Sequence, residues 1–244
     1  MCPEYIYGAS LRQVYPSLTE RINERYDETV QRLRLVFSRG QELRYISHLD
    51  LMRLWERSLR RGEIPLAYSE GYSPHPRLSL AAPLPIGVTS EAELMDVIVH
   101  RSVSAHFVMR NVRQQVPRGL DILELSHVPV TAPSLQSQVR YAEYRVAVVA
   151  DKNAEEIRTA IDSLLRTREL PWQHMRDTGP RFYDLRMLIE HTWLESCHGL
   201  TFTLGMKLRC GPQGTGRPEQ VTAALGLTQQ ALSIHRTKLI LAEN

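Results

Sequence analysis

The chain has 244 residues and a formal net charge of +3, and its apolar and charged fractions of 43% and 23% are ordinary for a folded protein. No run of 18 apolar residues is present, which excludes a membrane-spanning helix, and residues 1–30 lack the apolar core of a signal peptide. We therefore expect a cytoplasmic protein without membrane contact.

The cysteine content excludes some kinds of site, and the arginine content is compatible with nucleic-acid binding. Cys2, Cys197 and Cys210 are scattered and form no CxxC or CxxxCxxC pattern, which argues against a disulfide framework and against a cysteine-ligated zinc or iron–sulfur site. A self-contained radical enzyme is thereby excluded, and we expect no metal and no cofactor. The chain has 27 arginines and three lysines. This bias is typical of a GC-rich genome and also of phosphate and base recognition.

The first half of the chain shows the pattern of one mixed domain. Residues 31–39 alternate apolar and polar side chains, as a half-buried strand does. Ser47 is a suitable cap for a helix over 48–61, which Gly62 ends. The remaining segments are predicted as strands at 77–87 and 93–100, a helix at 102–117 and a strand at 120–130. Their order is β-α-β-β-α-β, which is that of a ferredoxin-like domain.

The second half repeats this order after a polar, proline-containing linker. Its predicted elements are a strand at 143–150, a helix at 153–170, strands at 183–195 and 199–209, a helix at 217–226 and a strand at 234–243. We therefore predict an α+β protein with two tandem ferredoxin-like halves. Its parts are an N-terminal extension (1–30), a first half (31–130), a linker (131–140) and a second half (141–244).

The predicted helix at 48–61 carries a basic stripe. If Leu51, Leu54 and Trp55 face the core, the arginines fall largely on the opposite side. Such a row of guanidinium groups can follow a phosphate backbone, although a solvated helix face partly neutralised by Glu56 and Glu63 has the same pattern. The four candidate phosphate contacts are Arg53, Arg57, Arg60 and Arg61.

His48 and Asp50 lie at the entrance of the same helix. Asp50 is well placed to interact favourably with the positive end of the helix dipole, and this structural role competes with acid–base chemistry. Neither His48 nor His75 belongs to an HxH or HxxxH pair, so a metal site is not indicated.

The stretch "AYSEGYSPHPRLSLAAPLPIGV", residues 67–88, is a loop stiffened by four prolines. Proline restricts the unfolded chain, so the native loop shape costs less entropy to hold. Tyr68, Tyr72, His75 and Arg77 are side chains suited to stacking on unpaired bases and to contacting phosphate. The alternative is a proline-rich loop that packs on the sheet for stability.

A third candidate is "RCGPQGTGRPEQ", residues 209–220, where glycines lead into a predicted helix. Backbone amides at such a position can bind an anion, and Gly214, Gly216 and Arg217 are the candidate residues. The segment lacks the GxxxxGK[ST] pattern of a P-loop, so ATP or GTP is not expected. A plain flexible turn between a hairpin and a helix is the alternative.

The blocks "SHLDLMR", "LAYSEG", "PHPRLS" and "PLPIGVTSE" make the chain similar to a bacterial radical-SAM-associated family of unknown function. The resemblance covers residues 31–244 and is densest over 45–96. Members of that family occur beside or fused behind a radical-SAM protein, often near genes for an E/G-type ribonuclease and ribosomal proteins. The resemblance implies a radical-SAM protein as partner and a role in RNA metabolism, and it implies no catalytic residues.

Together these observations predict an RNA-binding accessory module that presents RNA to a radical-SAM enzyme. An RNA enzyme is one alternative: Asp50 would be the nucleophile of a pseudouridine-synthase-like reaction, or His48 or His75 the general base of a metal-independent endoribonuclease. A protein–protein adaptor that does not touch RNA is the other. Such an adaptor would bind its partner with little salt dependence, whereas phosphate binding weakens steeply with salt.

Overall fold

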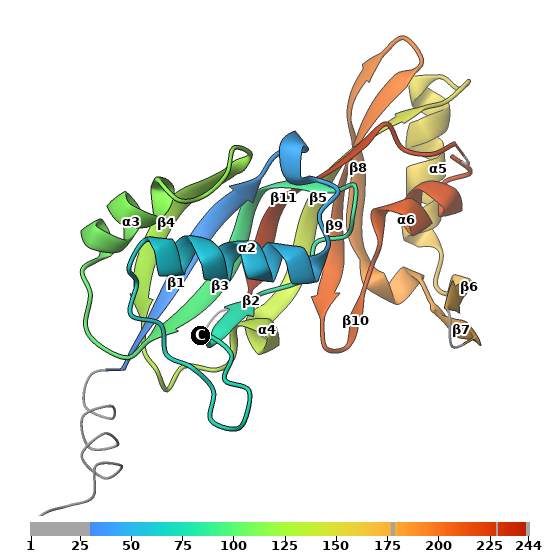
Figure 1. Cartoon of the computed structure of the whole chain (residues 1–244). Coiled ribbons are helices and arrows are strands. Elements are labelled where there is room, and N and C mark those ends of the chain that lie inside the picture. Colours follow the sequence, from blue (N-terminus) through green and yellow to red (C-terminus); the bar gives the residue numbers. More distant parts are fainter. Residues whose placement is uncertain (1–29, 177–178, 228, 243–244) are drawn as a thin grey trace, which may run out of the picture.

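A computed structural model describes residues 30–176, 179–227 and 229–242 (Figure 1). All but the last residue of the predicted N-terminal extension lies outside the described residues. Helices and strands alternate along the rest of the chain around one large mixed sheet, so the predicted α+β class is confirmed. No helix in the described part of the chain is long and apolar enough to cross a membrane.

The first half is built around strand β1 (Gln31–Arg39). The alternation in its sequence buries Leu33, Leu35 and Phe37 completely, as period-two packing requires. β1 pairs antiparallel with β3 (Thr89–Val99) and with β4 (Leu120–Val128), and the short β2 (Leu78–Leu80) pairs antiparallel with β3. The four strands therefore lie in the order β4-β1-β3-β2.

Two helices cover this half. The short 3-10 helix η2 (Gln41–Leu43) leads from β1 towards α2 (His48–Arg61), which lies across β1 and β3 in Figure 1. α3 (Ala105–Arg113) begins at Ser104, whose hydroxyl accepts the Phe107 amide at 3.2 Å. Trp55 and Leu59 of α2 and Val108 and Val112 of α3 join the strand residues in one hydrophobic cluster.

The second half has the same arrangement of its principal strands. β5 (Val139–Val149) pairs antiparallel with β9 (Thr201–Gly211) and β11 (Ser233–Leu241), and β8 (Ile189–His198) pairs antiparallel with β9. The order β11-β5-β9-β8 thus repeats that of the first half. α5 (Ala154–Arg166) begins with a capping box at Asn153, and α6 (Pro218–Ala224) has its proline in the first turn.

The two halves share one sheet. β11 pairs in parallel with β3 through only two residue pairs, His235 with Thr89 and Arg236 with Ser90. This contact joins the strands in the order β10-β9-β5-β11-β3-β1-β4, with β2 on β3 and β8 on β9. A second hydrophobic cluster fills the second half, and it includes Ala81 and Ala82 from the first. The halves therefore contact each other through both backbone and core.

Several elements differ from the predictions. The strand predicted over 77–87 is confined to Leu78–Leu80, because prolines farther along lack the N–H that a ladder needs. The strand predicted over 183–195 begins only at Ile189, after the 3-10 helix η3 (Arg186–Leu188). The predicted linker contains the short helix α4 (Leu135–Gln138), in which Leu135 is buried. The elements without a predicted counterpart are the hairpin β6 (Pro171–Arg176) and β7 (Gly179–Asp184) and the two-residue β10 (Gly214–Thr215).

Candidate nucleic-acid interface

Helix α2 begins and ends at the predicted residues. The Ser47 hydroxyl accepts the Asp50 amide at 3.1 Å and donates to Asp50 Oδ2 at 2.7 Å, which fixes the first turn. Leu51, Trp55 and Leu59 are buried on the side that faces the sheet. This leaves the four candidate arginines of the helix, Arg53, Arg57, Arg60 and Arg61, exposed.

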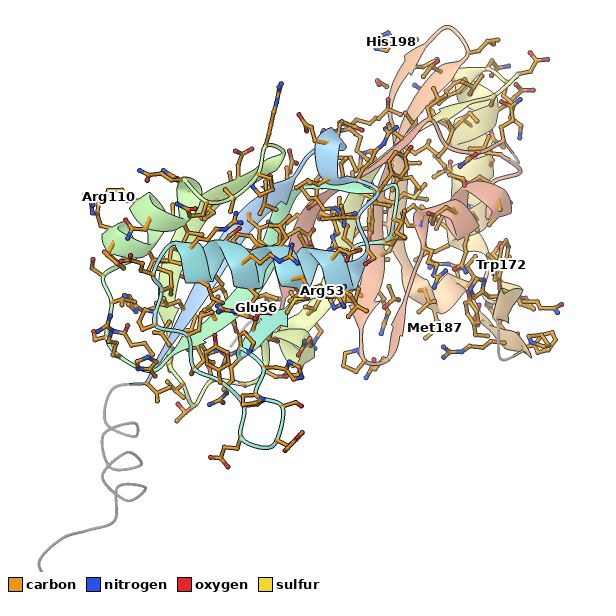
Figure 2. The ribbon with its side chains drawn as sticks, viewed as in Figure 1. Arg53, Glu56, Arg110, Trp172, Met187 and His198 are labelled. Atoms are coloured by element: carbon orange, nitrogen blue, oxygen red, sulfur yellow. The ribbon has the colours of Figure 1, made fainter. Side chains whose placement is uncertain are left out.

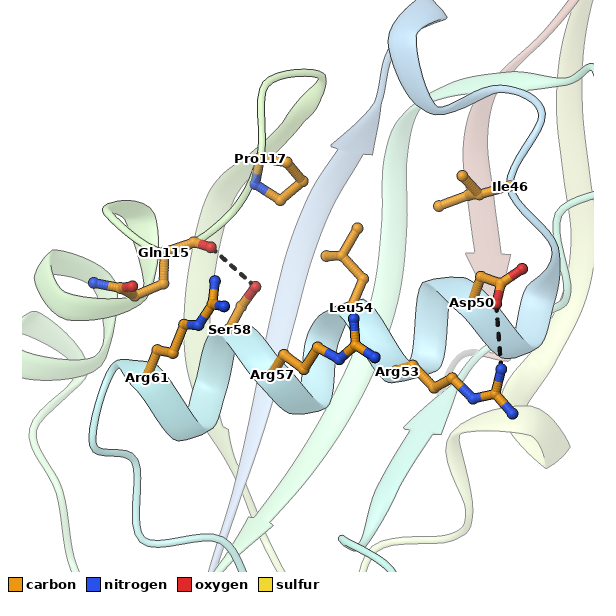
Figure 3. Close-up of a pocket in the computed structure, with 9 residues that line it drawn as sticks. All are labelled: Ile46, Asp50, Arg53, Leu54, Arg57, Ser58, Arg61, Gln115 and Pro117. Atoms are coloured by element: carbon orange, nitrogen blue, oxygen red, sulfur yellow. Dashed lines mark hydrogen bonds and ion pairs between the residues drawn. The ribbon is translucent and has the colours of Figure 1, made fainter.

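Three of these arginines line one cavity of about 520 Å³ (Figure 3). Arg53, Arg57 and Arg61 follow one another along α2 at spacings of four residues, so their side chains lie on one side of the helix. The opposite wall is the segment at Gln115 and Pro117 after α3. The Ser58 hydroxyl donates to the Gln115 carbonyl at 3.2 Å and holds the two walls together.

The charge in this cavity is not balanced. Arg53 Nη1 lies 3.4 Å from Asp50 Oδ1. Glu56 lies 3.8 Å from Arg60 and so partly neutralises the stripe, as the alternative interpretation expected, but neither of these two residues lines the cavity. Within the described ranges, Arg57 and Arg61 have no acidic partner. The α2 cavity, defined by Arg53, Arg57 and Arg61, therefore carries uncompensated positive charge.

Asp50 and His48 are placed as a helix start requires. Asp50 is more than half exposed and is engaged by Ser47 and Arg53. His48 is the first residue of α2 and is exposed, and it does not line the α2 cavity. The geometry of Asp50 is thus that of a capping carboxylate paired with the next turn of its own helix.

The proline-rich loop is pinned at its base and open at its tip. Ala67 donates its amide to Ile98, and the Ser69 amide donates to the His75 carbonyl at 2.8 Å, so the loop closes on itself. The four candidate side chains, Tyr68, Tyr72, His75 and Arg77, are all exposed, and Tyr72 is fully so. In Figure 1 the loop projects beyond the sheet below α2. None of the four side chains lines the α2 cavity.

The third candidate group lies at a different place, in the junction of the two halves. Gly214, Gly216 and Arg217 line a cleft of about 800 Å³, which we call the junction cleft. Its walls are the segments 83–88 and 211–220 and the hairpin β6–β7. The Gly216 amide already donates to the Arg209 carbonyl at 2.9 Å, and α6 has only seven residues. The side chains around the cleft, rather than these amides, therefore determine what it can bind.

The floor of the junction cleft contains a buried ionic cluster. Arg236 is 1% exposed, and its guanidinium contacts both oxygens of the Glu93 carboxylate, with Nε 2.7 Å from Oε1. Its Nη2 also donates to the Ala82 carbonyl at 3.1 Å. Burial is the largest single influence and disfavours the charged guanidinium, but Glu93, together with Tyr144 and Cys210, outweighs it, so the pKa of Arg236 is raised. The Arg236 guanidinium therefore stays charged inside the protein.

These cluster residues were not among the predicted site residues. Glu93 lies in "ELMDVIVH" and Arg236 in "IHRTKLIL", each at an inward position of an alternating strand. Such residues could have been recognised from the sequence, because a charged group at an inward-facing strand position must find a partner when it is buried. The identity of that partner could not be read locally, since Arg236 and Glu93 are 143 positions apart.

Tyr144 lies beside this cluster, and its ionisation should make the free energy of unfolding depend on pH. Burial is the main reason that its pKa is raised to about 12. A tyrosine in the unfolded chain ionises near pH 10, so the neutral phenol stabilises the fold below that pH, and this contribution is lost as the pH rises towards 12. We expect the free energy of unfolding to fall by about 2–3 kcal/mol more between pH 10 and 12 in the parent than in Tyr144→Phe. Urea titrations at both pH values measure this difference, and equal losses in the two proteins would contradict it.

Comparison with known proteins places the chain in a family. A family model described as an uncharacterized protein conserved in bacteria (DUF2344) matches residues 32–218, and no curated protein matches. A Cbf5–Nop10–Gar1 complex is similar at 10% identity and a TM-score of 0.45, over 86% of this chain and 48% of that chain. An archaeal box H/ACA sRNP Nop10–Cbf5 complex is similar at 11% identity and a TM-score of 0.45, over 91% of this chain and 51% of that chain.

A putative glycine cleavage system transcriptional repressor is similar at 12% identity and a TM-score of 0.24, over 87% of this chain and 98% of that chain. The chain thus spans about half the length of the first two matched chains. The family model matches most of the amino-acid sequence, from β1 to the start of α6. On this evidence the protein belongs to the bacterial family DUF2344.

Proposed function

We propose that the protein binds RNA through the α2 cavity and the proline-rich loop. The observation that carries this proposal is the pair Arg57 and Arg61, which line one cavity one helical turn apart and have no acidic partner among the described residues. Guanidinium groups in such a row match successive phosphate oxygens, and each gains more from a phosphate than from solvent.

The loop adds a preference for unpaired bases. Tyr72 has its whole ring in solvent, and Tyr68, His75 and Arg77 are also exposed. Exposed aromatic rings on a loop of fixed shape can stack on bases that are not paired, whereas the bases of a duplex present no free face. The proposed ligand is therefore single-stranded RNA, with phosphates at α2 and bases at the loop.

The proposed partner is a radical-SAM enzyme, to which this protein would present the RNA. The support is the family resemblance carried by the blocks between residues 45 and 96. We further propose that each half, 31–130 and 141–244, is a ferredoxin-like domain, with 131–140 as the linker. The repeated strand order and the antiparallel pairing within each half support this assignment.

The proposal predicts a salt-sensitive affinity that depends on two arginines. We expect the double variant Arg57→Glu/Arg61→Glu to bind a fluorescent single-stranded RNA at least tenfold more weakly than the parent. The slope of log affinity against log salt should fall by about 1.4, since each lost phosphate contact on a single strand removes about 0.7. Fluorescence anisotropy at four salt concentrations measures both quantities.

The matched control is Arg110→Glu/Arg158→Glu, which makes the same charge change at exposed positions on α3 and α5. Arg110, in the last turn of α3, is labelled in Figure 2. The RNA affinity of this control variant should stay within about twofold of that of the parent, because the variant alters only charges far from the proposed site. Equal losses in both double variants, or a parent that does not bind RNA, would overturn the proposal. Salt-insensitive binding to a radical-SAM protein without RNA binding would identify an adaptor.

A further inference from the structure

The junction cleft is larger than the α2 cavity and lies where the two halves meet. Its volume is about 800 Å³, within the range of sites that hold small ligands. Loop residues Pro83 and Pro85 come from the first half, whereas Gln220 and Arg236 come from the second. Met187, which also lines the cleft, is labelled in Figure 2. A ligand in this space would contact both halves at once.

Positive charge exceeds negative charge beneath the cleft. Arg39 is completely buried close to the Arg236–Glu93 pair, so two guanidinium groups share one buried carboxylate. Arg39 Nη2 donates to the carbonyls of Pro85 and Val88 at 2.7 and 2.6 Å, while its Nε and Nη1 have no hydrogen-bond partner among the described residues. A buried cation that is incompletely paired stabilises an anion placed nearby.

The rim of the cleft carries basic and acidic side chains. His174 and Arg181 lie opposite each other in the β6–β7 ladder, and Arg217 stands on the other wall. Two acids line the same space. Asp184 Oδ1 already accepts the amides of Leu170 and Arg186 at 2.8 and 2.9 Å, and Glu219 is exposed at the start of α6. Among the described residues no carboxylate forms an ion pair with Arg181 or Arg217, so both guanidinium groups can contact a phosphate.

Gln220 gives the cleft a second kind of recognition group. Its side chain is 7% exposed, it lines the cleft, and its buried Oε1 has no hydrogen-bond partner in the described part of the chain. A buried amide oxygen without a partner costs free energy, which a ligand donor would recover. Primary amides form paired hydrogen bonds with the edges of bases, because both carry a donor and an acceptor side by side.

We propose that the junction cleft binds a nucleotide, with the phosphate between Arg181 and Arg217 and the base edge at Gln220. A ligand with one anionic end and one planar end that both donates and accepts hydrogen bonds fits this distribution of groups. The proposal goes beyond RNA binding at α2, because the cleft uses none of the α2 residues. The same chemistry is offered by a free nucleotide and by an unpaired nucleotide of an RNA.

Calorimetric titration of the full chain with AMP, GMP, CMP and UMP tests this site, with inorganic phosphate and the four nucleosides as partial ligands. We expect at least one monophosphate to bind tenfold or more tightly than phosphate and than its own nucleoside. Arg217→Glu and Gln220→Leu should each weaken that binding at least tenfold, and Arg110→Glu should leave it unchanged. Because Arg217 is exposed, its variant tests the site even where Gln220→Leu does not fold.

Two further measurements distinguish a free nucleotide from a nucleotide of an RNA, and the site in the junction cleft from the site at α2. Binding of a monophosphate alone supports a free nucleotide, whereas binding of a single-stranded hexanucleotide that requires both Arg217 and Gln220 supports an RNA nucleotide. Arg57→Glu/Arg61→Glu should bind the monophosphate like the parent, so failure at α2 is distinguishable from failure at the cleft. Phosphate binding as tight as that of every nucleotide, or no binding of nucleotide or oligonucleotide that depends on these residues, overturns the nucleotide site.

Discussion

Replacement of Glu93 by alanine is expected to lower the free energy of unfolding by about 3–5 kcal/mol. Glu93 is 3% exposed, and its carboxylate is the acidic group that acts on both Arg236 and Arg39. Without it two guanidinium groups remain buried with backbone carbonyls as their main partners, and their burial limits the compensation that water can provide. The loss follows from the stranded charges rather than from the small volume that is removed.

Urea denaturation followed by circular dichroism measures this loss. Glu91→Ala is the matched control, because Glu91 lies two residues away on β3 and is 56% exposed, with only a 3.7 Å contact to His235. We expect the control to change the stability by less than about 1 kcal/mol. The double variant Glu93→Ala/Arg236→Met should recover much of the loss. A Glu93→Ala protein as stable as the control would show that the buried cluster is not ionised.

Trp55→Ala should be comparably damaging, with a loss of about 3–5 kcal/mol. Trp55 is completely buried between α2 and the sheet, and its ring meets that of Phe37 edge-on at a centroid distance of 4.9 Å. Removing it leaves a cavity that the surrounding strands cannot fill, since β1 is held by partners on both sides.

The control for Trp55 is the same substitution at Trp193, which is 37% exposed and lies against Gly205 on the sheet. Thermal unfolding should show less than half the loss for Trp193→Ala. Trp55→Phe is informative as well, because the indole Nε1 of Trp55 has no hydrogen-bond partner within the residues that the structure describes, and its removal breaks no such bond. If Trp55→Ala and Trp193→Ala melt at the same temperature, the first half does not depend on this packing.

Sequence patterns predicted the local elements well and their assembly poorly. α2 has its predicted bounds because its signals, Ser47 at the start and Gly62 at the end, lie within the segment itself. The core positions of β1 follow in the same way from alternation. The strand expected over 77–87 was wrong in extent, because apolar residues among prolines resemble a strand but cannot form a continuous ladder.

In the candidate sites, too, the features set by neighbouring residues could be predicted and those set by distant residues could not. The arginines of α2 could be assigned to one surface because helical spacing is local. That only Arg53, Arg57 and Arg61 share a cavity depends on Gln115 and Pro117, which come from beyond α3. The third candidate group, Gly214, Gly216 and Arg217, lies on one wall of the junction cleft. The rest of the cleft could not be predicted, since it requires Thr89 and His235 to meet across 146 positions, with their side chains 2.7 Å apart. No periodicity encodes such a pairing.

The parallel contact between β11 and β3 has a consequence for protein synthesis. A nascent chain leaves the ribosome from its N-terminal side, so β11 is the last strand of this sheet to emerge. Until then the Glu93 carboxylate and the Ala82 carbonyl lack the guanidinium that binds both of them. A ribosome stalled before residue 233 would therefore hold a first half in which Thr89 and Ser90 lack their partners in β11 and the Glu93 carboxylate keeps the Ser90 hydroxyl but lacks Arg236, a form suited to capture by chaperones or proteases.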